Sequence, residues 1–197
     1  MALILASSSA IRRQMLVNAG LSPETEPARV DEAAIRDALL AEEAPPRDIA
    51  DALAEAKARK VSARNPGQLV LGCDQVLAYK GRVFEKPVTL ENARADLQSL
   101  RGATHQLLSA AVLYLDAQPL WRHVGVARLT MRSFSDSYLE DYLSRNWPGI
   151  GESVGGYKLE EEGVRLFAQI QGDYFTILGL PLLELLNYLA LRGEIDG

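Results

Sequence analysis

The alternation of apolar and polar positions along the chain predicts strands and helices in turn. Short apolar runs bounded by turn residues are typical of buried strands, and apolar residues three or four positions apart are typical of helices that cover a sheet. We predict strands at 3–6, on each side of Asp74, and at 106–115, 121–131, 164–170 and 174–178, and helices at 11–19, 31–39, 48–63, 90–100, 135–143 and after Pro181. With 197 residues, the chain is long enough for one sizeable domain, which we expect to occupy residues 1–197.

The stretch 69–87 contains an unusual polar residue. Asp74 stands between two apolar runs, where a carboxylate is costly unless it is paired or binds a metal. Lys80 and Gly81 predict a hairpin turn, which would return Lys86 to the same end of the sheet. A carboxylate near lysines suits metal-assisted phosphate chemistry. Taken alone, however, the stretch slightly favours a solvated aspartate at a strand end beside an unrelated surface lysine.

The helix predicted at 48–63 has a lysine on its apolar face. Apolar residues repeat there at a four-residue spacing, and Lys57 occupies the missing step. Such a cation either lies along the apolar surface and reaches water or points into a polar pocket. Lys60 also faces this side, so the spacing alone leaves both interpretations open.

The first predicted strand leads through three serines, at 7–9, into a helix with two arginines in its first turn. Unpaired N–H groups at a helix start bind anions, whereas cations such as Arg12 and Arg13 oppose the helix dipole there. An anionic ligand would remove this conflict. Serines that cap a helix beside two solvated arginines explain the local sequence equally well.

The composition excludes several classes of protein. The formal net charge of −5 lacks the basic character of a general nucleic-acid binder. Cys73 is the only cysteine, which excludes an internal disulfide and a cysteine metal cluster and fits a reducing compartment. The chain has neither a run of about 20 apolar residues nor a signal-peptide pattern. We therefore expect a cytoplasmic protein without nucleic-acid or membrane partners.

A series of short motifs resembles the Maf nucleotide pyrophosphatases in order and spacing. These motifs are LILASSSAIRRQML at 3–16, VDE at 30–32, LAEAKA at 53–58, GCDQV at 72–76, EKP at 85–87, GATH at 102–105 and GDYFTILGLPL at 172–182. The resemblance covers nearly the whole chain. It implies an α/β fold with a mixed, strongly twisted sheet flanked by helices, in two lobes with a central cleft (Maf/ITPase-like). It also implies hydrolysis of a nucleoside triphosphate between its α- and β-phosphates, to a monophosphate and pyrophosphate.

The resemblance implies roles for the unusual polar residues. Asp74 is similar to the carboxylate that activates water, and Glu32 to its acidic partner, both near a divalent cation, Mg²⁺ or Mn²⁺. A triphosphate brings about four negative charges, so its site needs cations and a metal bridge. The groups implied to surround the phosphates are Arg12 or Arg13, Lys57 and Lys86, with Ser7 and Ser9 in the phosphate loop.

Three positions concern the base. In the subgroup directed at 7-methyl-GTP, the catalytic aspartate is followed by glutamine, and a lysine follows the glycine-rich loop. Gln75 and Lys158 resemble this subgroup rather than the pyrimidine-directed one, which has threonine and glutamine there. Ile11 stands at the extra position before the arginine pair, where an aromatic residue would stack on a cationic methylated base. Ile11 cannot stack in this way, so it leaves the exact base open. The alternative is a dTTP/UTP pyrophosphatase.

Two other classes of function compete with the hydrolase. A nucleotidyltransferase of mixed α/β fold also opens with a strand, a loop and an arginine, although its loop is rich in glycine rather than serine. A nucleotide-binding regulator of septum formation is the second alternative, which the family implies. The family also implies a homodimer.

Overall fold

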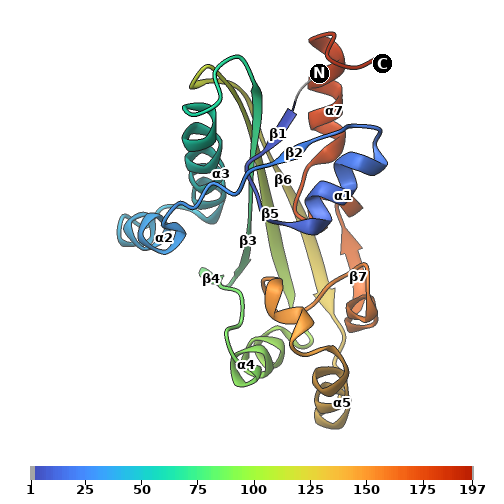
Figure 1. Ribbon diagram of the computed structural model, residues 1–197. Coiled ribbons are helices and arrows are strands. Elements are labelled where there is room, and N and C mark those ends of the chain that lie inside the picture. Colours follow the sequence, from blue (N-terminus) through green and yellow to red (C-terminus); the bar gives the residue numbers. More distant parts are fainter. Residues whose placement is uncertain (1–2, 197) are drawn as a thin grey trace. The chain divides into compact units, whose positions relative to one another are not determined.

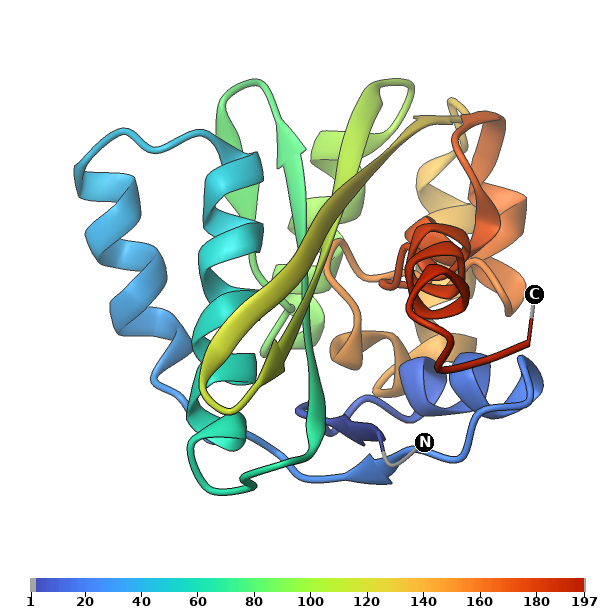
Figure 2. The same ribbon diagram turned by 90° about the horizontal axis from the view of Figure 1, so that it is seen from above.

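The structure, a computed structural model, describes residues 3–196, whose strands form a mixed sheet with helices beside it (Figures 1 and 2). The strand order is β2-β1-β3-β5-β6-β7, with β4 paired to β3. β1 is parallel to β2 and β3, whereas the β3–β4 and β6–β7 pairs are antiparallel. The strands are β1 (Leu3–Leu5), β2 (Glu24–Thr25), β3 (Leu69–Tyr79), β4 (Arg82–Phe84), β5 (Thr104–Leu115), β6 (Gln118–Met131) and β7 (Phe167–Gln171). The α/β class is confirmed.

Four long helices begin at a residue whose side chain caps the helix. Serine, threonine or aspartate accepts a backbone N–H at the start of α1 (Ala10–Asn18), α2 (Glu32–Ala41), α4 (Leu90–Leu100) and α5 (Asp136–Asn146). The other two long helices, α3 (Pro46–Ser62) and α7 (Leu182–Leu191), follow prolines. Within the described residues, no helix has both the length and the apolar character needed to cross a membrane.

The chain divides into two compact units. The first comprises Met1–Gln75, Leu108–Gly125 and Gly179–Gly197. Its buried apolar residues come from β1, β3 and β5 and from the helices on the two sides of these strands, with α3 on one side and α1 and α7 on the other (Figure 2). α2 lies beside α3. This unit contains Asp74 and most of the other predicted site residues.

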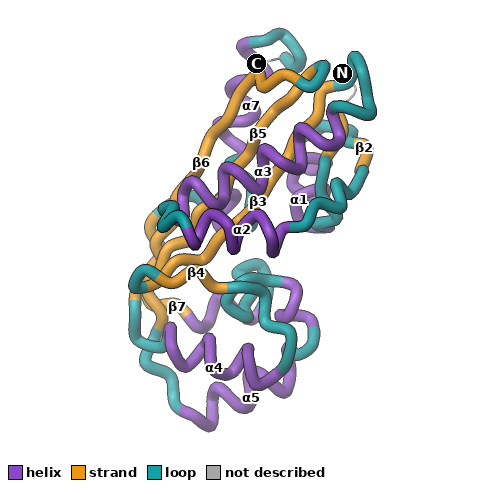
Figure 3. Tube along the Cα trace, turned by 90° about the vertical axis from the view of Figure 1, so that its left-hand side faces the viewer, coloured by secondary structure: helices purple, strands orange, loops and turns teal. Residues whose placement is uncertain are grey.

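The second unit comprises Val76–Leu107 and Val126–Leu178. Its helices α4 and α5 lie side by side (Figure 3). The β3–β4 hairpin turns at Lys80 and Gly81, both with positive φ, as the sequence predicted. Two short 3-10 helices, η1 (Gly149–Glu152) and η2 (Glu162–Leu166), lie in and after the glycine-rich loop.

Three strand predictions need correction. The strand predicted at 174–178 is the short helix α6 (Tyr174–Ile177), because Asp173 accepts the N–H of Thr176 at 2.8 Å and caps a helical turn. The strand predicted at 164–170 begins only at Phe167, since the residues before it form η2. The two strands predicted around Asp74 are one continuous strand, β3, because a paired carboxylate does not interrupt the ladder.

A buried histidine of the second unit predicts a loss of stability in acid. Burial lowers the pKa of His105 to about 4, and its Nε2 lies 2.7 Å from the Tyr157 hydroxyl. The pKa of His105 is lower in the folded than in the unfolded protein. Its contribution to the free energy of unfolding is therefore fully present above about pH 6.5 and decreases as the pH falls toward the folded-state pKa. Lowering the pH from about 7.5 to about 5 should decrease the free energy of unfolding by about 2 kcal/mol through the titration of His105.

Urea denaturation at the two pH values measures this effect. The variant His105→Gln cannot titrate, so its free energy of unfolding should lack this pH-dependent part. An equal decrease in both proteins would contradict the assignment to His105.

Candidate active site

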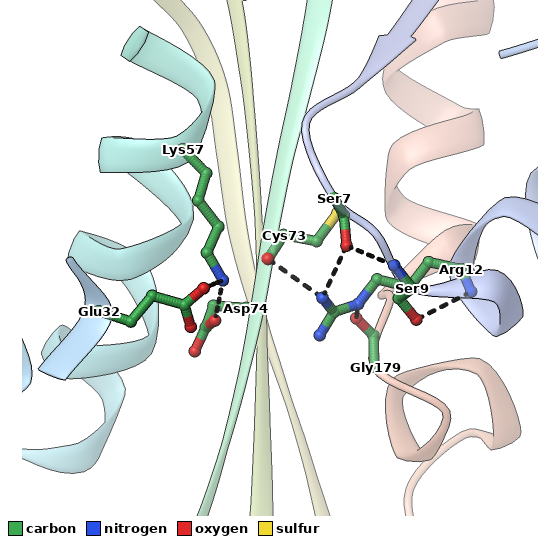
Figure 4. A network of polar contacts seen from close by, with 8 residues as sticks. All are labelled: Ser7, Ser9, Arg12, Glu32, Lys57, Cys73, Asp74 and Gly179. Atoms are coloured by element: carbon green, nitrogen blue, oxygen red, sulfur yellow. Dashed lines mark hydrogen bonds and ion pairs between the residues drawn. The ribbon is translucent and has the colours of Figure 1, made fainter. Parts of the chain in front are cut away.

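Two polar clusters lie on opposite sides of β3 in the first unit (Figure 4). One joins Asp74 to side chains from α2 and α3, and the other joins Arg12 to the backbone carbonyl of Cys73. Cys73 and Asp74 are consecutive residues of the strand. β3 therefore contacts an acidic cluster on one side and an arginine on the other.

Asp74 lies on β3, and its side chain is paired with a lysine of α3. Lys57 Nζ donates to Asp74 Oδ1 at 2.6 Å and lies 3.0 Å from Glu32 Oε1, so one ammonium group contacts two carboxylates. Asp74 and Lys57 are buried, whereas Glu32 is exposed. None of the residues that the structure describes donates a hydrogen bond to Asp74 Oδ2. This second oxygen is therefore free to accept a proton.

The contact between Lys57 and Asp74 depends on close packing of α3 on β3. A Cβ atom at Gly72 would overlap the carbonyl oxygen of Ala54 and would lie 2.7 Å from the backbone nitrogen of Ala58. Only glycine permits this approach. Because Lys57 precedes Ala58, the same contact places the ammonium beside the carboxylate. Of the two interpretations of Lys57, the polar pocket is correct.

Burial controls the protonation of Asp74. Desolvation raises the pKa of its carboxyl above the usual range and outweighs the lowering effects of Lys57 and Arg12, while Glu32 adds to the rise. A carboxylate with a raised pKa is a stronger base once it is ionised. The site thus holds a buried carboxylate that suits proton abstraction.

The start of α2 presents Glu32. Asp31 caps the helix, and Glu32 is its first residue. Lys60, one turn after Lys57 on α3, donates from Nζ to the carbonyl of Arg29 at 2.6 Å, and Arg29 has a φ of 49°. Lys60 therefore anchors the segment before Glu32, while Lys57 contacts the carboxylates.

The second cluster distinguishes the two arginines. Arg12 is half-buried and donates to the carbonyl oxygens of Cys73 at 3.2 Å and Gly179 at 2.8 Å, whereas Arg13 is exposed. Ser7 Oγ lies 3.4 Å from Arg12 Nη1. The loop before α1 thus holds Arg12, not Arg13, next to β3.

The two predicted loop serines have ordering roles in this structure. Ser7 is buried and its hydroxyl accepts the N–H of Ser9 at 3.2 Å, while Ser9 Oγ accepts the N–H of Arg12 at 3.5 Å. These bonds shape the loop and cap the helix, as the purely local interpretation of the serines expected. They also fix the backbone from which Arg12 extends.

Of the residues predicted to read the base, Gln75 has a defined partner. Its Nε2 donates to Ser109 Oγ at 2.9 Å, and Ser109 is buried on β5. Ile11 lies half-buried on α1. Both belong to the first unit.

Two predicted residues belong to the second unit. Lys158 Nζ lies 3.6 Å from Glu152 Oε2 and 3.6 Å from Glu161 Oε1, and Lys86 is an exposed residue between β4 and α4. The structure therefore joins Glu32, Lys57 and Asp74, and separately Ser7, Ser9 and Arg12. For Lys86 and Lys158, a place beside the substrate stays a prediction.

Sequence reasoning missed the groups that position the site. Gly72 had a signal, since glycine inside a strand pattern marks close backbone approach. Ser109 also had one, because a hydroxyl within a buried apolar run requires a partner. The carbonyl oxygens of Cys73 and Gly179 had none, because a backbone acceptor has no residue type.

The acidic groups are of the type that binds hard divalent cations. Across the described residues, no group of three or more histidine, cysteine, aspartate or glutamate side chains could hold a metal ion by itself. The cluster supplies two carboxylates, Glu32 and Asp74, around Lys57. Mg²⁺ is commonly bound by one or two carboxylates together with substrate phosphates and water. The donor set therefore fits Mg²⁺ or Mn²⁺.

Comparison with known proteins covers almost the entire chain. Residues 2–191 match the family model described as Maf-like protein. A nucleoside triphosphate pyrophosphatase from Ruegeria pomeroyi is 62% identical over 194 residues, covering 98% of each chain. A 7-methyl-GTP pyrophosphatase from Mesorhizobium japonicum is 52% identical, covering 99% of this chain and 98% of that protein.

Among solved structures, a nucleoside-triphosphatase / dITP/XTP pyrophosphatase from Mycobacterium abscessus shares 16% identity with a TM-score of 0.41, covering 98% of this chain and 94% of that one. The family model and the close relatives cover the segments that form both polar clusters. The chain belongs to the Maf family.

Proposed function

We propose that this chain is a nucleoside triphosphate pyrophosphatase that hydrolyses the bond between the α- and β-phosphates, with 7-methyl-GTP as its preferred substrate. The reaction is supported by membership of the Maf family and by the printed names of its relatives. The observation that carries the mechanism is the buried contact between Lys57 and Asp74, with the second carboxylate oxygen unpaired among the described residues.

Asp74 acts as the general base. Lys57 fixes Oδ1, so Oδ2 accepts a proton from the attacking water. The raised pKa of Asp74 strengthens it as a base, provided that the carboxyl is ionised at the working pH. Lys57 stabilises this ionised form and keeps the carboxylate in place.

Arg12 binds the phosphates. Neutral oxygens hold its guanidinium, and none of the described carboxylates forms an ion pair with it, so its charge is available to an anion. Arginine donors match phosphate oxygens in a planar fork. The available charge of Arg12 therefore supports a site for a phosphorylated substrate.

A divalent cation completes this proposal. Glu32 and Asp74 would hold Mg²⁺ or Mn²⁺ together with the substrate phosphates. When bound, such a cation supplies electrostatic stabilisation of the leaving pyrophosphate and a lower pKa for a bound water. The residues of the chain then orient the phosphates and accept the proton.

The preference for 7-methyl-GTP rests on two residues and on relatives. Gln75 and Lys158 match the residues expected for this subgroup, and a relative named for 7-methyl-GTP is 52% identical. The hydrogen bond from Gln75 Nε2 to Ser109 Oγ fixes the orientation of the Gln75 side chain. Ile11 would contact the base through its apolar side chain only.

The test is pyrophosphate release from a panel of triphosphates. The panel comprises 7-methyl-GTP, GTP, dTTP, UTP and CTP, each with Mg²⁺, with Mn²⁺ and with a chelator. We expect release that depends on the cation, and a kcat/KM for 7-methyl-GTP that exceeds the others by about tenfold or more.

The outcomes separate the parts of the proposal. A preference for dTTP or UTP would keep the reaction and refute the proposed base. Full activity with the chelator would refute the cation. No release from any triphosphate by the folded protein would refute the reaction itself.

A further inference from the structure

We infer that Gly179 is a positioning residue for Arg12. Its backbone carbonyl anchors the guanidinium, and its lack of a side chain leaves room for it, so that Arg12 presents its remaining N–H groups to a phosphate. The inference rests on the proposed function and deepens it, because it assigns a role in phosphate binding to the turn before α7.

The anchoring uses three neutral oxygens. Arg12 Nε donates to the carbonyl of Gly179 at 2.8 Å, and Nη1 donates to the carbonyl of Cys73 at 3.2 Å and to Ser7 Oγ at 3.4 Å (Figure 4). None of the described residues hydrogen-bonds to Nη2. The hydrogen bond to Gly179 is the shortest of the three and fixes Nε of the guanidinium group.

Such anchoring fixes direction without cancelling charge. A guanidinium is rigid and planar, so holding Nε and Nη1 also sets the direction of the Nη2 N–H groups. A carboxylate in place of the carbonyls would neutralise the cation. Neutral acceptors leave the charge for an incoming anion, and the fixed geometry lowers the entropy cost of binding it.

Gly179 cannot be replaced without moving the guanidinium. Its φ is +101°, a conformation that residues with side chains rarely adopt. A Cβ atom there would lie 3.1 Å from Arg12 Nε and 3.1 Å from Nη2. The added methyl group would therefore crowd both Nε, which donates the anchoring hydrogen bond, and Nη2, which we infer faces the ligand.

The experiment compares Gly179→Ala with the wild type and with a matched control. Gly67→Ala introduces the same methyl group at a φ of +75°, where nothing lies within 4 Å. For each protein, the KM and kcat of pyrophosphate release and the Kd for inorganic pyrophosphate are measured. We expect Gly179→Ala to raise KM and Kd about tenfold to a hundredfold, with a smaller change in kcat, and Gly67→Ala to stay within about twofold.

A double-mutant cycle separates positioning from general damage. If Gly179 acts through Arg12, Gly179→Ala should weaken pyrophosphate binding in the wild type but add almost nothing in the Arg12→Ala background. Additive losses would overturn the inference, as would a Gly179→Ala protein that binds pyrophosphate like Gly67→Ala. Because pyrophosphate binding is measured directly, the inference is tested even if the wild type hydrolyses no triphosphate.

A second variant covers the case in which Gly179→Ala does not fold. Arg12→Lys keeps a positive charge but lacks the Nε–H that donates a hydrogen bond to the Gly179 carbonyl. We expect its pyrophosphate affinity to fall close to that of Arg12→Ala. Affinity near the wild-type value would show that charge alone suffices, which would overturn the role of the anchor.

Discussion

Replacing Asp74 with asparagine is expected to lower kcat for pyrophosphate release by about 10²–10⁴-fold, the usual contribution of a general base. Asparagine has nearly the same shape and can still contact Lys57, but its amide cannot accept the proton from water. Glu32 remains 3.0 Å from Lys57, so the ammonium keeps one carboxylate partner. The unfolding transition should therefore change little.

The matched control is Asp37→Asn, the same chemical change at an exposed aspartate of α2. It should keep wild-type kcat. Single-turnover release of pyrophosphate, measured with equilibrium binding of a non-hydrolysable triphosphate, separates chemistry from affinity. An Asp74→Asn protein that binds normally and retains more than about a tenth of kcat would refute Asp74 as the base.

The sequence singled out the residues of the acidic cluster, but it did not determine how they contact one another. The lysine at the missing step of the α3 ladder and the aspartate between two apolar runs were both visible, and they prove to be partners at 2.6 Å. Nothing in the spacing of Lys57 chose between water and a pocket. That choice depends on Gly72, whose missing side chain lets the helix approach the strand. A tertiary contact of this kind is not encoded in the periodicity of either segment.

The second cluster shows a different limit. The serine loop and the arginine pair were visible, but Arg12 and Arg13 could not be ranked, because both lie in the first turn of α1. The two arginines are distinguished by the carbonyl of Gly179, which is distant in sequence and accepts a hydrogen bond from Arg12. At the same end of the chain, the strand predicted at 174–178 is helical, because the cap formed by Asp173 outweighs the β-propensity of its aromatic and β-branched residues.

Gly72→Ala is expected to lower the free energy of unfolding by about 3 kcal/mol and to reduce catalysis as well. The new methyl group would overlap the Ala54 carbonyl and lie 2.8 Å from Ala58 Cβ, and backbone atoms cannot move aside as a flexible side chain can. The chain must therefore separate α3 from β3. This separation would move Lys57 from Asp74, so the activity lost should exceed the fraction of protein unfolded. Urea denaturation and pyrophosphate release, both at neutral pH, measure the two effects.

The control is Gly149→Ala, where an added Cβ atom meets nothing within 4 Å and φ is not in the left-handed region. It should change the free energy of unfolding by less than about 0.5 kcal/mol. If Gly72→Ala were equally harmless, close packing of α3 on β3 would not be what sets the Lys57 position. If instead it lost stability but kept full kcat at temperatures where it is folded, the ion pair would survive the separation of helix and strand. Gly72 would then be needed for folding alone, and Lys57 would reach Asp74 through the flexibility of its own side chain.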